Sequence, residues 1–99
     1  LYIAEGSNNE PEPNKANILL PYLAKWTGTV VAELRMVPNQ PLQFAGENGR
    51  KRTEDEIVAY TWTQFLKTGD ETWPIRLPMT KAAVKAMDTV SAHMKPRLE

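Results

Sequence analysis

The chain has 99 residues, of which 41% are hydrophobic and 24% charged, and this composition is typical of a globular protein rather than a disordered one. Basic and acidic residues number 12 each, so the net charge is zero and the basic excess typical of nucleic-acid and membrane-surface binding is absent. The chain contains no cysteine, which excludes disulfides, thiolate metal ligands and a cysteine nucleophile. No apolar run approaches the length that spans a bilayer, so no membrane segment is expected within this chain.

Two strands with a helix between them are predicted for the first third of the chain. Leu1–Ala4 is a short apolar run typical of a buried strand, and Thr29–Val37 is rich in β-branched residues. Asn14 is expected to cap a helix that ends near Thr27. Pro21 leaves two alternatives open, because the helix either begins late, with Pro21 in its first turn, or is kinked there. Together these elements predict a βαβ unit with parallel strands and a right-handed crossover.

The most regular helix is predicted to begin at Thr53. Thr53 and Glu56 have the spacing of a capping box, and Glu54 and Asp55 add negative charge to the first turn, where the helix dipole favours it. Gly69 is expected to end this helix. The apolar positions recur at helical spacing and are expected to pack against the core: Ile57, Val58, Thr61, Trp62, Phe65 and Leu66.

The remaining residues are predicted to form loops and one further helix. Residues 38–41 are a turn bounded by prolines, 43–52 a charged exposed loop, and 70–78 a connection punctuated by prolines. The last helix is expected over Thr80–Met94, with Pro96 stopping it. Its buried stripe is predicted to contain Ala83, Met87, Val90 and Met94.

Few side chains offer catalytic chemistry. Ser91 and His93 lie two positions apart on a helix, so they point in different directions and cannot form a local dyad. The acidic residues 54–56 could suggest a metal, but the helix start accounts for them and no further ligand is nearby. Residues 70–71 before Trp73 could form a binding loop, although a large aromatic beside prolines more often packs in the core. Composition and spacing therefore assign no catalytic residue, metal or cofactor.

One turn has a position that is suited to ligand binding. Gly6, Ser7 and Asn8 follow the first predicted strand directly, at the carboxyl edge of a parallel sheet, where open α/β sheets bind ligands. In α/β-hydrolases one oxyanion-hole amide comes from the loop between the third strand and the first helix. Backbone amides in such a loop can stabilise a tetrahedral oxyanion. Gly6, Ser7 and Asn8 are therefore the candidate oxyanion or binding loop.

Several long sequence words occur in order along the chain, namely VAELRMVPNQPL at 31–42, RTED at 52–55, AYTW at 59–62, TGDETWP at 68–74, LPMTK at 77–81 and AMD at 86–88. With these words the chain resembles the PhoPQ-activated pathogenicity-related protein family. The resemblance implies a three-layer, α/β-hydrolase-like fold. This chain would supply a partial sheet, as a βαβ unit followed by two helices.

The resemblance also implies where the chain would sit in that fold. Gly6 to Asn8 would match the family's glycine-serine-asparagine segment after the third strand, Thr29–Val37 the fourth strand, and Thr80–Met94 the helix before the nucleophile elbow. Residues 1–99 are then expected to be one partial domain that ends before the elbow serine and lacks the nucleophile, the acid and the histidine. Glu5 stands where the family's turn has a second glycine, so its backbone must adopt an angle that glutamate allows.

Three functional alternatives stay open. The intact protein would be a serine-type hydrolase of unknown substrate, or a non-catalytic secreted signalling or binding protein on the same scaffold, or the chain would be a complete small α/β domain. The expected ligand is an unidentified small molecule or peptide, and exposed sheet edges predict self-association. The localisation is unknown, and a secreted or periplasmic location is compatible with the resemblance.

Overall fold

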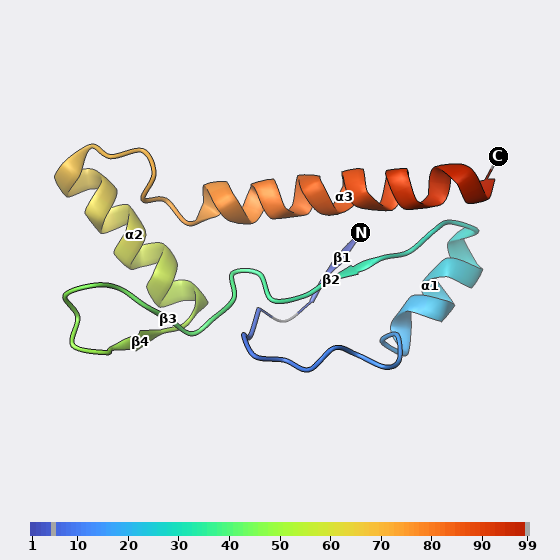
Figure 1. The fold of residues 1–99 in the computed structure, drawn as a ribbon, viewed down its shortest axis with the longest axis horizontal. Coiled ribbons are helices and arrows are strands. Elements are labelled where there is room, and N and C mark those ends of the chain that lie inside the picture. The colour runs from blue at the N-terminus through green and yellow to red at the C-terminus, as the bar shows by residue number, and fades with distance from the viewer. Residues whose placement is uncertain (5, 99) are drawn as a thin grey trace.

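The computed structural model describes residues 1–4 and 6–98, and its chain combines short strands with longer helices (Figure 1). The parallel pair β1–β2 places Tyr2 opposite Glu33 and Ile3 opposite Leu34. With α1 between the two strands, the predicted βαβ unit is present and the fold is mixed α/β. The elements in chain order are β1 Tyr2–Ile3, α1 Leu19–Thr27, β2 Glu33–Leu34, β3 Leu42–Gln43, β4 Lys51–Arg52, α2 Glu54–Thr68 and α3 Arg76–Leu98.

Helix α1 begins at Leu19, later than a cap at Asn14 would place it. Pro21 is its third residue and lies in the first turn, where the missing proline N–H costs no helical hydrogen bond. The late-starting alternative is therefore confirmed. The Asn17 side chain accepts a hydrogen bond from the Leu19 amide at 2.9 Å, so Asn17 rather than Asn14 satisfies the first amide of the helix. Gly28, with φ of 64°, ends the helix as predicted.

The second strand is shorter than the sequence predicts. Its β-branched residues favour extended structure over Thr29–Val37, but the ladder covers only Glu33–Leu34 because β1 offers a partner of the same short length. Beyond β2 the chain turns. Met36 and Asn39 have φ of 63° and 71°, and both X-Pro bonds of the 38–41 turn are cis. Strand length here is set by the available partner and not by propensity alone.

The predicted charged loop contains a β-hairpin. β3 and β4 pair antiparallel, with Leu42 opposite Arg52. Asn48 and Gly49 both have positive φ in the connection, and an Asn-Gly dipeptide is a recognised hairpin signal. Arg52 also donates two hydrogen bonds to the Glu47 carboxylate, at 2.9 Å and 2.6 Å, which hold the connection against β4. The prediction of a charged exposed loop over 43–52 was therefore wrong at its two ends, where short strands form.

Helix α2 begins and ends where the sequence predicts. Thr53 and Glu56 form the capping box, in which the Glu56 carboxylate accepts a hydrogen bond from the Thr53 amide at 3.4 Å. Gly69, with φ of 71°, ends the helix. The predicted apolar face is only partly covered. Its buried members are Ile57 and Thr61, and its exposed members are Trp62 and Leu66.

Helix α3 is longer than predicted at both ends. It begins at Arg76 rather than Thr80, because Pro78 lies within the first turn, where proline is tolerated. It also continues past Pro96 to Leu98. The prediction of a buried stripe was wrong, since none of the described residues of α3 is buried. The helix runs alongside the β1–β2 pair (Figure 1), yet a cavity remains between them, lined by Leu1, Val30, Ala32, Met87, Val90 and Ser91.

The described chain buries little of its surface. Leu20 and Ile57 are its buried aliphatic side chains. The exposed surface of 7503 Å² is about 1,800 Å² larger than expected for a compact monomer of this mass. The radius of gyration is 16.8 Å, against about 13 Å for a compact chain of similar length. Among the described residues, no helix is long and apolar enough to cross a membrane.

Candidate functional site

The turn after β1 lies against the turn that follows β2. The Gly6 carbonyl accepts a hydrogen bond from the Gln40 amide at 2.7 Å, and the Asn8 amide donates one to the Gln40 carbonyl at 2.5 Å. These two bonds form a parallel bridge between Ser7 and Gln40. Because β1 and β2 run parallel, both turns follow the carboxyl ends of their strands. The structure therefore brings Gly6, Ser7 and Asn8 to the sheet edge where the sequence places them.

Gly6 is buried in this contact and has no room for a side chain. A Cβ at this position would lie 2.6 Å from the Val37 carbonyl oxygen and 2.6 Å from Cδ of Pro38. One of these atoms belongs to the backbone and the other to a rigid ring, so neither can move aside cheaply. Glycine is therefore required here by close approach of two chain segments. The prediction about the backbone angle of Glu5 falls outside the described residues.

The Asn8 side chain holds the same pair of turns together. Its Nδ2 donates hydrogen bonds to the Pro41 carbonyl at 2.9 Å and to the Asn39 carbonyl at 3.3 Å. Its Oδ1 accepts a hydrogen bond from Asn9 Nδ2 at 2.8 Å. Both the backbone amide and the side-chain amide of Asn8 thus bind the 39–41 turn. An oxyanion at this loop would compete with Gln40 for the Asn8 amide.

Gln40 connects these turns to helix α2. Its Oε1 accepts a hydrogen bond from the Glu54 amide at 2.7 Å. The first amides of a helix have no partner within the helix, so the Gln40 side chain satisfies one of them. Residue 40 was predicted to be part of a plain turn, and this role was not predicted. The available signal was a polar side chain held between two prolines, shortly before a capping box.

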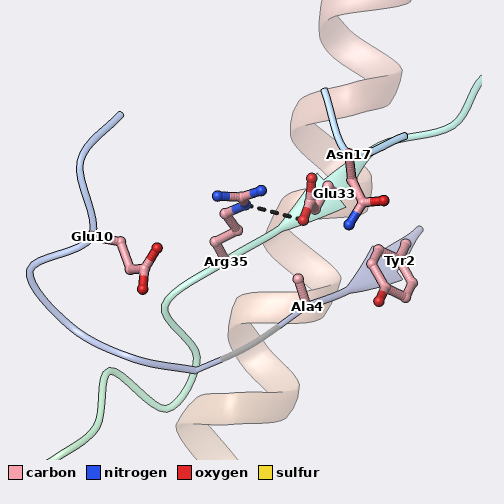
Figure 2. Close-up of a pocket in the computed structure, with 6 residues that line it drawn as sticks. All are labelled: Tyr2, Ala4, Glu10, Asn17, Glu33 and Arg35. Atoms are coloured by element: carbon pink, nitrogen blue, oxygen red, sulfur yellow. Dashed lines mark hydrogen bonds and ion pairs between the residues drawn. The ribbon is translucent and has the colours of Figure 1, made fainter. Parts of the chain in front are cut away.

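A polar cavity of about 220 Å³ lies on the face of the β1–β2 pair opposite α3 (Figure 2). Side chains on alternate strand positions share one face, so Tyr2 and Ala4 lie beside Glu33 and Arg35. Glu10 and Asn17, from the connection between β1 and α1, complete the lining. No residue of this cavity was a candidate from the sequence, although the alternation of Glu33 and Arg35 in an otherwise apolar strand was visible there.

One ion pair lies within the cavity lining. Arg35 Nε donates to Glu33 Oε1 at 3.0 Å. The Glu33 side chain is only 9% exposed, whereas that of Arg35 is 32% exposed. A carboxylate that is this deeply covered needs its cationic partner, because an unpaired charge in such a position is strongly unfavourable.

The other sequence candidates are not brought into a common site. Ser91 and His93 are both exposed on α3. The acidic residues 54–56 occupy the first turn of α2, where Glu56 also forms an ion pair with Arg50 at 3.6 Å. Across residues 1–4 and 6–98, no group of three or more acidic or histidine side chains is arranged to hold a metal ion.

The aromatic residue after α2 packs, as the sequence favoured. The Trp73 ring lies 6.1 Å from the rings of both Phe44 and Tyr60, measured between centroids. The Arg52 guanidinium group stacks over the Tyr60 ring, 4.4 Å from its centroid. The hydrogen bonds that Arg52 donates to Glu47 hold the pKa of the Glu47 carboxyl group below its usual range. The residues before Trp73 form a local turn, in which the Thr72 hydroxyl and amide donate to Asp70 and lower the pKa of its carboxyl group.

Comparison with known proteins found a matching family model and a similar curated protein. The family model described as PhoPQ-activated pathogenicity-related protein matches residues 1–98. The chain is similar to autocrine proliferation repressor protein A of Dictyostelium discoideum, with 44% identity over 97 residues, which is 96% of this chain and 19% of that protein. The chain thus spans about one fifth of the length of this curated relative. No solved structure matches it.

Proposed function

Because the chain belongs to the PhoPQ-activated pathogenicity-related protein family, we propose that it forms part of an α/β-hydrolase-like domain in a longer protein. The order β1, α1, β2 with a parallel strand pair supports this placement, since it matches a third strand, a first helix and a fourth strand. On this proposal residues 1–99 are one partial domain, and the intact protein is a serine-type hydrolase of unknown substrate. The nucleophile, the acid and the histidine then belong to other parts of the polypeptide.

The paired turns at the carboxyl edge of β1 and β2 carry the proposal. Open α/β sheets bind ligands at this edge, and amides that are fixed there in advance can stabilise a developing negative charge. We assign Gly6, Ser7 and Asn8 to the oxyanion side of the site. Gly6 permits the close approach to the second turn, and Asn8 holds the loop through Gln40. The Ser7 amide, at the centre of this loop, is assigned to the reacting carbonyl oxygen.

Ester hydrolysis by the intact protein tests this proposal. The intact protein should turn over p-nitrophenyl acetate and react with a fluorophosphonate at a serine outside residues 1–99, whereas residues 1–99 alone should do neither. Ser7→Pro removes the assigned amide and should lower kcat by about 10²- to 10³-fold. Ser7→Ala keeps the amide and is the matched control, which should retain turnover. Loss of turnover in Ser7→Ala would make the hydroxyl the reacting group and contradict the assignment.

A non-catalytic secreted signalling or binding protein on the same scaffold is the second candidate function. The name of the 44% identical relative favours it, since autocrine proliferation repression describes signalling rather than hydrolysis. In that case the folded intact protein would show neither turnover nor labelling. Its ligand would be a small molecule or peptide, and a secreted or periplasmic location would suit it. A G-x-S-x-G-like turn downstream, followed by an acid and a histidine, would favour the enzyme instead.

The unpaired edges of the β1–β2 sheet support the partial-domain proposal. Within the described residues, β1 and β2 each pair on one side only. Further strands of the same polypeptide would add to these edges in a hydrolase-like sheet, and without them residues 1–99 should self-associate. Size-exclusion chromatography and circular dichroism of residues 1–99 check this expectation. A compact monomer that melts cooperatively would instead support a complete small domain.

A further inference from the structure

The polar cavity on the β1–β2 pair presents charges of both signs to the same small space. Glu10 and Glu33 supply two carboxylates, and Arg35 supplies one guanidinium group. In the view of Figure 2 the guanidinium group lies between the two carboxylates. A ligand that enters this space therefore meets both acceptors and donors of charge-assisted hydrogen bonds.

The ion pair in the lining leaves donors for a ligand. Arg35 uses Nε for its bond to Glu33, and a guanidinium group carries four further N–H donors on its terminal nitrogens. Glu33 accepts this bond through Oε1, and a carboxylate has lone pairs on both oxygens. Because the Glu33 side chain is only 9% exposed, it gives the ion pair a fixed position on the strand.

The neutral residues of the lining add directional groups. The Asn17 Oδ1 atom already accepts a hydrogen bond from the Leu19 amide, so Asn17 offers its amide N–H groups to the cavity. The Tyr2 hydroxyl can both donate and accept. These groups suit a ligand with a hydrogen-bonding group at each end.

The size and charge of the cavity together select a ligand class. Its volume of about 220 Å³ is below the range of roughly 300–1,000 Å³ that drug-sized ligands occupy, so the ligand is small. A simple cation would leave the Arg35 donors unused, and a simple anion would meet Glu10 and Glu33. We propose that this cavity binds a small zwitterion of the amino-acid class, with its carboxylate on the terminal nitrogens of Arg35 and its ammonium group on Glu10.

Titration calorimetry of the intact protein tests the proposal with L-alanine, L-valine and L-glutamine as probes. Saturable binding of at least one probe is expected. The half-ligands ethylamine and propionate should each bind at least about tenfold more weakly, because each leaves one charge of the cavity unmatched. Binding of none of the three amino acids, or equal binding of either half-ligand, would overturn the proposal.

Variants locate the binding to this cavity. Glu10→Gln removes an exposed carboxylate and should weaken amino-acid binding about two- to fivefold. Glu12→Gln, in the same exposed connection but outside the lining, is the matched control and should leave affinity unchanged. Arg35→Gln should abolish binding. Because it leaves Glu33 covered and unpaired, the double variant Glu33→Gln with Arg35→Gln provides a second test without a lone charge. Unchanged affinity in both the double variant and Glu10→Gln would overturn the assignment.

Discussion

The backbone amide of Asn8 donates a hydrogen bond to the carbonyl oxygen of Gln40, and this contact joins two turns that are far apart in the sequence. The Gln40 side chain continues the connection, because its Oε1 accepts the Glu54 amide at 2.7 Å. The turn after β1 is thus connected to the start of α2 through Gln40. The position of the candidate loop therefore depends on hydrogen bonds more than on apolar burial.

The Asn8 side chain should contribute measurably to stability. Asn8→Ala removes its donors and leaves the carbonyls of Asn39 and Pro41 without this partner, so we expect the free energy of unfolding to fall by about 1–2 kcal/mol. Asn14→Ala, in an exposed segment, is the matched control and should change it by less than about 0.5 kcal/mol. Urea unfolding measures both. Equal effects of the two variants would show that Asn8 does not hold the turns together.

Close packing at Gly6 predicts a severe effect of the smallest side chain. In Gly6→Ala the new Cβ would meet the Val37 carbonyl oxygen and Pro38 at 2.6 Å, so we expect a loss of about 1–3 kcal/mol or displacement of the loop. Gly28→Asn is the control, because its φ of +64° lies in the left-handed region that Asn adopts, and nothing lies within 4 Å of a Cβ there. Thermal unfolding compares the two. A Gly6→Ala variant as stable as the wild type would contradict the close approach.

Local chemistry made α2 predictable before the structure. The Thr53–Glu56 capping box and the glycine at position 69 act within one helical turn of their own positions, so no tertiary information is needed to place them. The turn position of Gly6 was predictable from the sequence, but the reason that it must be glycine was not. That reason is the close approach of Pro38, a residue far along the chain. The bond between Gln40 and Glu54 is non-local in the same way.

Other features depended on packing that a sequence pattern does not contain. The periodicity of α3 predicts a covered stripe, but coverage requires a partner surface, and Met87 is 49% exposed in the structure. Pro78 was predicted to lie in the connection before the last helix, although its position in a first turn allows the helix. The polar cavity was not predicted, because Glu10 and Glu33 line the same space only once the crossover connection has folded beside β2.

The buried position of Ile57 predicts a large stability effect. Its side chain has 0% exposure, so Ile57→Ala should lower the free energy of unfolding by about 2–5 kcal/mol. Leu66→Ala, on the same helix with 79% exposure, is the matched control and should cost less than about 1 kcal/mol. Denaturant unfolding measures the pair. Similar losses would mean that Leu66 is covered in the protein under test.

The Glu47–Arg52 pair predicts a pH dependence. Hydrogen bonds from Arg52 lower the pKa of Glu47 below its ordinary value of 4.5. The unfolded state then binds more protons between the two pKa values. The contribution of the pair to the free energy of unfolding is therefore present above about pH 4.5 and is lost as pH falls through the folded-state pKa. Glu47→Gln should reduce this acid-side slope, and so should Arg52→Gln, which keeps the carboxyl group but removes its partner. Unfolding at a series of pH values measures the slope, and an unchanged slope in both variants would contradict the assignment.

Burial in this chain is concentrated on α2, where Ile57 and Thr61 lie inside and the Thr61 hydroxyl accepts the Ile75 amide at 3.3 Å. Helix α3 has 23 residues against the 15 of α2, yet none of its described residues is buried. Backbone amides exchange with solvent deuterium through local opening, and opening is easiest where few apolar contacts must be broken. The amides of α2 should therefore exchange more slowly than those of α3, so protection would follow burial and not helix length.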